Sequence, residues 1–463
     1  MIKNGEYEGV VEGLGTDGEG IIKVEGTTAF VPFCLVGERV RFKALKVKAN
    51  IAYGKLIEVL QNSTARVEPK CPVFGKCGGC NLQHAEYAAQ LNFKRESVKT
   101  ALKKIGGIDC EVQPCVPCEK EYGYRNKLVL PIGTDGEGKT VVGFYATHSH
   151  RIVPTDGCAI QSEWVTDVIS AVKRYIDNSG LSGYDGQTQK GELRHIVVRE
   201  IKGKFIFALV ATKEVNAQKL ISSLAENFKE FTFLLNINSK PTNAIFGDKW
   251  KTLHGEGFFE AEEVGIKYTA GVNTFLQVND GVRAKLYSRV LDEAEEGVVA
   301  LDLYSGGGML TAMLAKKCGA AYGIEVVEEA SRCADELKEK NSLDGKMFNI
   351  CGTVEEKIDG VMKATAGKKR VIVCDPPRKG MERSVVRAIS KAGADKIILV
   401  SCNPATLARD LGLLLGTVEE VDGKLLKTSG GDCEYLIDSV TPYDMFPQTK
   451  WCETVAVISK KAN

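Results

Sequence analysis

From about Gly271 onward the chain alternates segments typical of strands with segments typical of helices. Strands are expected at residues 298–303, 321–326, 347–351, 371–374 and 396–401, and helices near 309–317, 328–341, 382–392 and 404–415. Because parallel strands need a crossover of about a dozen residues, usually a helix, this alternation predicts a doubly wound parallel sheet. Ligands of such sheets bind at the carboxyl ends of the strands, so the residues that follow each strand are the first candidates for a site.

The first part of the chain has a different pattern. Residues 1–60 read as short strands separated by glycines, which suits a small OB-like β-barrel. Residues 61–270 contain a cysteine-rich stretch, a helix expected at 85–102 with an apolar face, and then mixed strands and helices. A chain of 463 residues fits two to four domains. We therefore expect a multidomain protein with a β-barrel at 1–60, an α+β domain at 61–270 and an α/β Rossmann-like domain at 271–463.

One strand of the expected barrel carries a strip of cations. Between Arg39 and Ile57 every charged residue is basic, and Arg39, Arg41 and Lys43 alternate with apolar residues. A strand with this pattern presents its cations on one face and its apolar side chains on the other. The strip suits a phosphate backbone, although an ordinary solvated barrel face has the same pattern. The 61 basic and 60 acidic residues nearly balance, so nucleic-acid affinity must come from such local patches.

The fifteen cysteines are many for a chain without an expected export signal. The N-terminal residues include acids and lack an apolar core, and no run of about 18 uncharged apolar residues predicts a membrane span. We expect a cytoplasmic protein in which some thiols bind metal or take part in catalysis. Two triplets qualify as metal ligands, each compatible with an iron–sulfur cluster or with zinc. The triplets are Cys71, Cys77 and Cys80, and Cys110, Cys115 and Cys118.

The first strand of the C-terminal domain ends in a glycine-rich turn. Tyr304 and Ser305 are followed by three glycines, and the second strand ends at Glu325. The glycines allow a ligand to approach the backbone, and a carboxylate at the end of the second strand can accept hydrogen bonds from a ribose diol. The turn has no Gly-Lys-Ser/Thr sequence, so it is not a phosphate-binding loop. This arrangement favours an adenosine-containing cofactor, either NAD or S-adenosylmethionine.

Two cysteines end later strands of the same sheet. Cys374 continues an apolar strand and is expected in the core, whereas Cys402 lies between a strand and a helix that begins at Pro404. A helix N-terminus favours a thiolate, which makes Cys402 a candidate nucleophile. Addition of a thiolate to C6 of a pyrimidine activates C5 toward a sulfonium methyl group, after which a base must remove the C5 proton. Glu453 opens an apolar strand and is a candidate base, although that pattern alone favours an ordinary surface carboxylate.

Together these features resemble the RNA uracil-5 methyltransferases that have an N-terminal TRAM barrel and an iron–sulfur cluster, and most closely the bacterial 23S ribosomal RNA branch. The resemblance covers nearly the whole chain. The matching motifs are Cys71-x5-Cys77-Gly-Gly-Cys80, Tyr124-Arg125-Asn126-Lys127, Asp156-Gly157-Cys158, Phe275-Leu276-Gln277-Val278-Asn279, the Tyr304 glycine loop, Asp375-Pro-Pro-Arg378, Ser401-Cys402-Asn403-Pro404 and the run from Asp444 to Thr449 ahead of Glu453.

The resemblance implies a role for each matching residue. Cys402 corresponds to the nucleophile and Glu453 to the base that abstracts the proton. The S-adenosylmethionine contacts correspond to Gln277, Tyr304, Glu325 and Asp375, and the ligands of a [4Fe–4S] cluster to Cys71, Cys77, Cys80 and Cys158. The cluster is expected to be structural or to contact RNA, not to initiate radicals, and a redox-sensing role stays open. Residues 1–60 correspond to an RNA-binding TRAM domain. The second cysteine triplet has no counterpart and is interpreted as incidental thiols. Two departures are Ser305, where many members have Cys, and Trp451-Cys452, where His-Val is common.

We therefore expect S-adenosylmethionine-dependent formation of 5-methyluridine in RNA, with 23S ribosomal RNA as the substrate. The alternatives are the same chemistry on tRNA and a non-catalytic RNA-binding iron–sulfur assembly factor. A uracil within a duplex hides C6, so the enzyme must take a loop nucleotide or flip the base out. Tyr124, Arg125 and Lys127 are candidates for stacking and phosphate contacts. The protein is expected to be a monomer that contacts no membrane.

Overall fold

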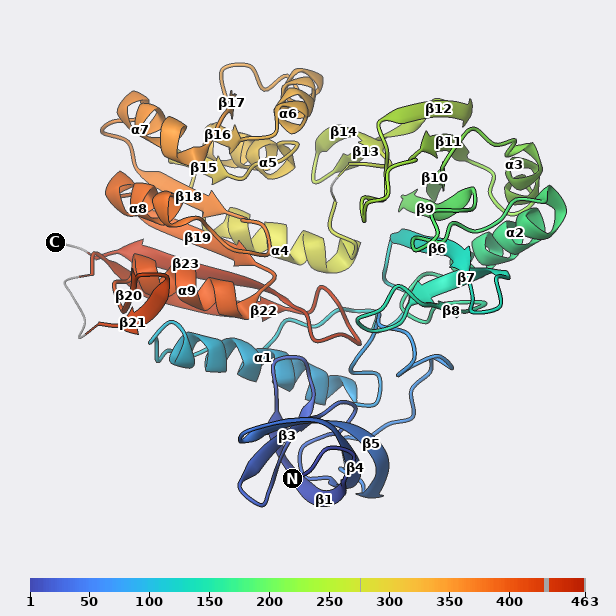
Figure 1. Cartoon of the computed structure of the whole chain (residues 1–463). Helices are drawn as coiled ribbons and strands as arrows, with labels where there is room; N and C mark the ends of the chain where they lie inside the picture. The colour runs from blue at the N-terminus through green and yellow to red at the C-terminus, as the bar shows by residue number, and fades with distance from the viewer. Residues whose placement is uncertain (275, 429–432, 462–463) are drawn as a thin grey trace. The chain divides into compact units, whose positions relative to one another are not determined.

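The computed structural model describes residues 1–274, 276–428 and 433–461 (Figure 1). It divides into two compact units, and both are discontinuous in sequence. The first unit contains Met1–Phe93, Lys120–Phe259 and Phe446–Lys450; the second contains Lys94–Glu119, Glu260–Met445 and the chain from Trp451 onward. The division into 1–60, 61–270 and 271–463 stays a prediction, because these units follow packing in space and not sequence order.

The N-terminal strands of the first unit close into a small β-barrel, as the sequence predicts. The strands are β1 (Glu6–Leu14), β2 (Gly20–Val24), β3 (Thr27–Val31), β4 (Arg39–Lys48) and β5 (Ile51–Gln61). Their order around the barrel is β1-β2-β3-β5-β4, with β4 paired to β1 to close it. Val11, Ile22, Val40 and Phe42 form part of the barrel core. The alternation predicted for β4 is confirmed, because Val40, Phe42 and Ala44 are buried while Arg39 is exposed.

The cations of β4 have acidic neighbours that the sequence pattern did not reveal. The Glu8 carboxylate on β1 lies 3.1 Å from a guanidinium nitrogen of Arg39 and 3.1 Å from one of Arg41. Arg41 also lies 3.3 Å from Glu58 on β5. Such exposed pairs contribute only about 0–1 kcal/mol each to stability. They nevertheless neutralise part of the positive strip, so its field is weaker than the sequence alone suggests.

The rest of the first unit is built on a seven-stranded sheet of order β12-β11-β10-β9-β6-β7-β8. Its elements are β6 (Lys127–Thr134), β7 (Thr140–Tyr145), β8 (Ile152–Pro154), α2 (Trp164–Ser179), β9 (Leu193–Ile201), β10 (Lys204–Ala211), α3 (Gln218–Ala225), β11 (Phe231–Ile237) and β12 (Lys249–His254). Helices α2 and α3 share one hydrophobic core with the strands, to which Leu128, Val168, Leu220, Phe207 and Phe233 belong. The expected α+β organisation of this region is therefore observed.

The second unit contains the doubly wound sheet predicted from the alternating pattern. Its strands are β15 (Val299–Leu303), β16 (Ala320–Glu325), β17 (Met347–Cys351), β18 (Arg370–Cys374), β19 (Lys396–Ser401), β22 (Tyr435–Tyr443) and β23 (Glu453–Lys460). The order is β17-β16-β15-β18-β19-β23-β22. Strands β15 to β19 run parallel, whereas β23 is antiparallel to both β19 and β22. The order reverses between β15 and β18, which is where doubly wound sheets bind ligands.

Helices cover this sheet, and two short hairpins complete the unit. The helices are α1 (Tyr87–Lys104), α4 (Asp280–Asp292), α5 (Met309–Cys318), α6 (Glu328–Lys340), α7 (Val354–Ala364), α8 (Arg383–Ala392) and α9 (Pro404–Leu414); the hairpins pair β13 (Phe258–Glu263) with β14 (Ile266–Gly271) and β20 (Val418–Val421) with β21 (Lys424–Lys427). Both α1 and β13 contain a boundary between the units. Within the described residues, no helix has both the length and the apolar character needed to span a membrane.

A buried ion pair fixes the connection between β22 and β23. The ammonium group of Lys94 on α1 contacts the carboxylate of Asp444, and both side chains are fully buried. Asp444 follows β22 directly, and its backbone N–H donates to the carbonyl oxygen of Val116. Removing two charges from water is costly, and their mutual attraction offsets this cost only while both remain. The pair therefore acts as a geometric constraint on the segment that leads to Glu453.

Replacing Lys94 with Met should destabilise the protein by about 3–5 kcal/mol, because it leaves the Asp444 carboxylate buried without its cation. The double variant Lys94→Met/Asp444→Leu should recover most of this loss, since it removes both charges. Thermal and urea unfolding followed by circular dichroism would measure the difference. A single variant as stable as the parent protein would show that the ion pair constrains nothing.

Candidate functional site

Five of the residues identified from the sequence lie along one edge of the C-terminal sheet. Glu325 ends β16, Tyr304 follows β15, Asp375 follows β18, Cys402 follows β19, and Glu453 begins β23. The first four strands are parallel and neighbouring, so their carboxyl ends meet at the same edge. Strand β23 is antiparallel, so its amino end reaches that edge. The strand order therefore assembles residues that are widely separated in sequence.

The register of β19 and β23 places Cys402 beside Glu453. Ser401 pairs with Thr454, so the next opposed positions in this antiparallel ladder are Cys402 and Glu453. Directly opposed residues in such a ladder have Cβ atoms about 4.5–5.5 Å apart. Glu453 is buried and is flanked on its other side by Tyr443 of β22. Cys402 is half-buried, and its helix α9 begins with Pro404 as expected, with Asn403 as the N-cap.

The surroundings of Cys402 oppose the thiolate that the helix N-terminus was expected to favour. Burial and then the charge of Glu453, with a smaller effect of Asp375, raise the pKa of Cys402 to about 11, while the Arg378 guanidinium acts in the opposite direction. The role of Cys402 as a nucleophile stays a prediction.

The pKa of the Glu453 carboxyl group is raised as well. Burial raises the pKa of Glu453 well above its usual value, the charge of Asp375 raises it further, and Arg378 lowers it. A buried carboxyl with a high proton affinity is suited to accept a proton during a reaction. The surface position that the strand pattern alone favoured for Glu453 is therefore not observed.

Arg378 is a member of this site that the sequence argument did not single out. It lies in the loop after β18, its guanidinium carbon sits 5.0 Å from the ring centroid of Trp451, and its carbonyl oxygen accepts from the Asn403 side chain at 3.3 Å. Its charge lowers the pKa of both Cys402 and Glu453. The sequence shows Arg378 three residues after Asp375, but the position of its side chain relative to Cys402 depends on the fold.

The glycine loop after β15 is held by Glu325. One carboxylate oxygen of Glu325 accepts from the backbone N–H of Gly306 at 2.9 Å, and the other accepts from Val327 at 2.8 Å. Gly308 has a φ of 79°, and a Cβ there would lie 2.7 Å from that of Ala334. The loop therefore requires glycine at this position, and the carboxylate expected to bind a ribose also shapes the loop.

A third carboxyl group, that of Asp302, lies beneath the loop. It is buried and accepts a hydrogen bond from the Thr311 hydroxyl at 2.6 Å. Burial and the charges of Asp375 and Glu325 together raise the pKa of Asp302 to about 7, against the Thr311 hydrogen bond. Burial also raises the pKa of Asp375 to about 7. Because the charges of Asp375 and Glu325 act on Asp302, these carboxyl groups lie near one another. A cluster of carboxyl groups favours a cationic ligand.

Tyr304 lies at this edge, whereas Gln277 is placed by its position before α4. Tyr304 is half-buried with a φ of 67°, a left-handed conformation that is unfavourable for a bulky residue and is often found at functional sites. Gln277 precedes α4, and its carbonyl oxygen accepts from Arg283 at 2.8 Å. The pKa of Tyr287 on α4 is raised by burial and by the charges of Asp375 and Asp302, so α4 packs against this edge. Phe275 of the same motif lies outside the described residues.

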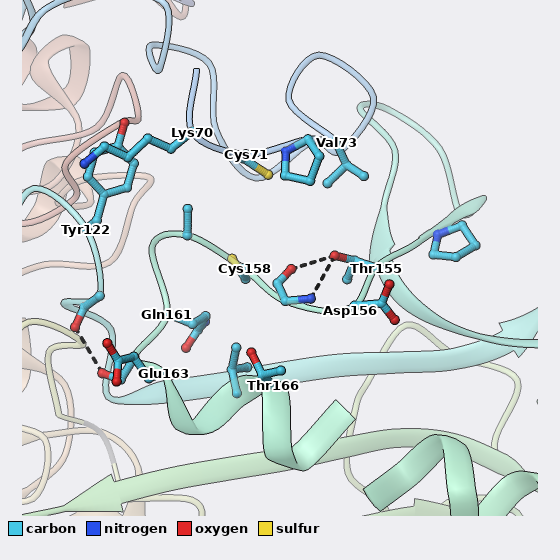
Figure 2. Close-up of a pocket in the computed structure, with 17 residues that line it drawn as sticks. Lys70, Cys71, Val73, Tyr122, Thr155, Asp156, Cys158, Gln161, Glu163 and Thr166 are labelled. Carbon is cyan, nitrogen blue, oxygen red and sulfur yellow. Dashed lines mark hydrogen bonds between the residues drawn. The ribbon is translucent and has the colours of Figure 1, made fainter. Parts of the chain in front are cut away.

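Cys71 of the first triplet and Cys158 line a pocket in the first unit. The pocket has a volume of about 610 Å³, and Cys71 and Cys158 lie on its wall. Figure 2 shows their sulfur atoms on facing sides, with Lys70 beside the ring of Tyr122. The Lys70 ammonium lies 4.3 Å from that ring centroid. The Cys71–Cys80 loop and the segment after β8 therefore meet, although they are far apart in sequence.

The pKa of Cys80 reports that these thiols lie near one another. Burial and then the charges of Cys158, Cys77 and Cys71 raise it to about 12, against a hydrogen bond with Gln83. The backbone N–H of Gly79 donates to the Cys77 sulfur at 3.4 Å, a contact that stabilises a thiolate. Within the described residues, however, no three His, Cys, Asp or Glu side chains are arranged to bind a metal ion. The donor set fits four-thiolate groups such as an iron–sulfur cluster or zinc.

The second triplet and Tyr124 have other environments. Cys115 and Cys118 are buried, and the Cys118 sulfur accepts from the Asn279 side chain at 3.2 Å. Tyr124 is also buried, and its hydroxyl donates to the carbonyl oxygen of Pro447 at 3.0 Å. Tyr124 therefore does not present its ring to a base, which corrects the prediction that it stacks on RNA. Lys127 is half-buried, and burial together with Arg199 and Arg125 lowers its pKa to about 8.

Comparison with known proteins agrees with this architecture. The model of the tRNA (uracil-5-)-methyltransferase family matches residues 86–422. An uncharacterized RNA methyltransferase of Clostridium tetani is 38% identical, covering 99% of this chain and 97% of the relative. An uncharacterized RNA methyltransferase of Listeria monocytogenes is 36% identical, covering 98% of both chains. The crystal structure of Pyrococcus abyssi tRNA (uracil-54, C5)-methyltransferase with S-adenosyl-L-homocysteine superimposes with a TM-score of 0.75 at 26% identity, covering 97% of this chain and 99% of that chain.

The doubly wound sheet, together with the family match and the likeness to a methyltransferase structure, identifies an S-adenosylmethionine-dependent methyltransferase, as the resemblance implied. More particularly, the chain belongs to the tRNA (uracil-5-)-methyltransferase family, and the protein is an RNA uracil-5-methyltransferase. The prediction of an enzyme acting on RNA is thereby confirmed.

The acidic edge makes a prediction about cofactor affinity. S-adenosylmethionine carries a sulfonium charge that S-adenosylhomocysteine lacks. Raising the pH from about 6 to about 8 ionises Asp302 and Asp375, whose pKa values are near 7, so the preference for S-adenosylmethionine should increase several-fold. Calorimetric titration of both compounds at several pH values would measure this ratio. In Asp302→Asn the ratio should depend less on pH, and a pH-independent ratio in the parent protein would contradict the prediction.

Proposed function

We propose that the protein forms 5-methyluridine in RNA through a transient covalent bond between the Cys402 sulfur and C6 of the target uracil. The observation that carries this proposal is the placement of Cys402 beside Glu453, at the sheet edge where Asp302, Asp375 and Glu325 gather. A nucleophile and a base at the same edge as the cofactor's methyl group are what methylation at C5 requires.

The reaction begins when the Cys402 thiol loses its proton to solvent and its sulfur bonds to C6 of the uracil. The electron pair of the C5–C6 double bond moves to C5 and the O4 carbonyl. Bound S-adenosylmethionine supplies an electrophilic methyl group, which C5 takes up while S-adenosylhomocysteine leaves. Glu453, which has by then lost its own proton to solvent and is a carboxylate, accepts the proton from C5; the C5–C6 double bond forms again, and the Cys402 thiolate is released.

The charged groups around Cys402 suit this sequence of steps. Arg378 is the nearby cation that lowers the pKa of Cys402, so it stabilises the thiolate that attacks C6. Neutral Glu453 does not oppose thiolate formation, whereas an ionised Glu453 does. Gln277, Tyr304, Glu325 and Asp375 are the residues that we propose to contact S-adenosylmethionine. The carboxylates among them oppose the positive charge of the cofactor.

We propose 23S ribosomal RNA as the substrate, with tRNA as a second candidate. The cysteine and active-site motifs resemble the 23S branch. The Pyrococcus abyssi structural relative, in contrast, is a tRNA (uracil-54, C5)-methyltransferase, and this likeness favours tRNA. The N-terminal barrel, interpreted as a TRAM domain, is the proposed RNA-binding module, with Lys43 and the partly neutralised Arg39 and Arg41 contacting phosphates.

We further propose that Cys71, Cys77, Cys80 and Cys158 hold a [4Fe–4S] cluster with a structural role. Support comes from the facing thiols in the pocket and from the Gly79 N–H donated to Cys77. Gly78 is needed where it is, because a Cβ there would lie 3.0 Å from the backbone nitrogen of Thr147. A bound group in this pocket would tie the loop to the segment that leads into α2, which helps to order the sheet.

Variants of the two reacting residues should separate the chemical steps. With RNA that contains 5-fluorouridine and with S-adenosylmethionine, the parent protein should form an adduct that survives denaturation, because fluorine at C5 cannot leave as a proton. Cys402→Ala should form none. Glu453→Gln should accumulate adduct on ordinary uridine RNA, since the C5 proton stays in place and sulfur cannot leave.

These adducts are measured by denaturing gel electrophoresis and mass spectrometry, with 23S ribosomal RNA fragments and tRNA transcripts compared in parallel. The RNA that forms the adduct is the substrate class. Rapid turnover by Glu453→Gln, or an adduct with Cys402→Ala, would refute the proposed roles.

The cluster is tested by metal analysis of protein purified without oxygen. The protein should be brown and contain about four irons per chain. Cys158→Ser should lower the iron content, whereas Cys115→Ser, which changes a buried thiol elsewhere, should retain it. A colourless protein with one zinc would exclude the cluster and favour the zinc alternative.

A further inference from the structure

Arg378 is anchored at two points near the reacting residues. Its carbonyl oxygen accepts from the side chain of Asn403, the residue after Cys402, at 3.3 Å. Its guanidinium carbon lies 5.0 Å from the centroid of the Trp451 ring, and Trp451 stands two residues before Glu453. The backbone of Arg378 is thus held from the β19 side of the site and its side chain from the β23 side. Its charge reaches both Cys402 and Glu453.

We propose that Trp451 is a positioning residue for methyl transfer, because its indole ring holds the Arg378 guanidinium beside Cys402 and Glu453. The inference rests on the proposed roles of those two residues. The Arg378 side chain is exposed, and an exposed arginine otherwise samples many rotamers. A cation over an aromatic face is attracted by the ring quadrupole, and tryptophan is the strongest partner for it.

The sequence context makes Trp451 distinctive. The resemblance leads to the expectation of His-Val before the base, whereas this chain has Trp451-Cys452. Cys452 is buried in the core of the sheet, but Trp451 is half-buried at the edge where Arg378 lies. The structure therefore gives the two positions different surroundings, and it is Trp451 that faces the site.

The groups that set the proton affinity of Cys402 come from three elements. Glu453 at the start of β23 and Asp375 after β18 raise its pKa, and Arg378 in the same loop as Asp375 lowers it. Arg378 is the cation that acts on Cys402 within the described residues. Release of its guanidinium from the indole would let it move into solvent and leave the two carboxylates unopposed. Trp451 thus acts on the nucleophile through Arg378, without touching the reacting atoms.

The experiment measures alkylation of Cys402 by iodoacetamide as a function of pH, quantified by mass spectrometry of the Cys402 peptide in the full-length protein. In Trp451→Leu the midpoint should rise by about half a pH unit, which makes the thiol about threefold less reactive below the midpoint. Trp451→Phe keeps an aromatic face and should shift the midpoint less. Arg378→Leu should shift it at least as much as Trp451→Leu.

The double variant distinguishes positioning from a general structural role. In the Arg378→Leu background, Trp451→Leu should cause no further shift, because the cation on which the ring acts is absent. A midpoint that stays at the parent value in Trp451→Leu overturns the proposal. So does a shift of equal size with and without Arg378, which would show that the ring affects the thiol by another route.

Adduct formation on 5-fluorouridine RNA separates this inference from the proposed function. If the parent protein forms an adduct and the rate of adduct formation falls about threefold in Trp451→Leu at neutral pH, the proposed function and the role of Trp451 are both supported. If the parent protein forms no adduct with any RNA while the alkylation midpoint still shifts through Arg378, the proposed function fails and the positioning of Arg378 by Trp451 remains. An adduct without any midpoint shift supports the function and removes the role of Trp451.

Discussion

The register of the C-terminal sheet is the constraint on which the site depends. A parallel ladder fixes where each strand ends relative to its neighbours, so Leu303 opposes both Ile324 and Cys374, and the residues that follow meet at one edge. Strand β23 is antiparallel, so it begins at this edge, which no parallel strand does. Its first residue, Glu453, therefore lies beside Cys402. A shift of β23 by one residue would turn Glu453 to the other face of the sheet. The buried ion pair of Lys94 with Asp444 lies at the connection that leads into β23 and opposes such a slip.

The electrostatics of this edge serve two opposing demands. A cationic cofactor is favoured by carboxylates, and Asp302, Asp375 and Glu325 gather there. A thiolate at Cys402, the proposed nucleophile, is disfavoured first by burial and then by the charges of Glu453 and Asp375, which together raise its pKa to about 11. In the proposed reaction the sulfonium charge of the cofactor and the protonation of Glu453 would each ease this conflict.

The sequence predicted the individual strands and helices of this fold better than the contacts between them. The strands of the C-terminal domain follow their apolar pattern closely, and the strand–helix alternation correctly implied the edge at which Cys402 and Asp375 lie. Glu453 as the neighbour of Cys402 was harder to predict, because no pattern within β23 shows that this strand pairs antiparallel with β19. Helix α1 shows the same limit. Its buried side includes Gln90 and Lys94, which were not part of the expected apolar face, because their partners Gln448 and Asp444 lie far along the chain.

The charge pattern of the barrel shows why residue types in the sequence alone overestimate the positive charge that a surface offers to phosphates. The alternation in β4 correctly predicted which side chains face outward, since it depends only on the period of the strand. Whether outward cations are available to phosphates depends on the neighbouring strands, and β1 supplies Glu8 against both Arg39 and Arg41. If the barrel binds RNA as proposed, a phosphate must displace or outcompete this carboxylate, so the strip attracts polyanions less strongly than a strip without acidic neighbours would.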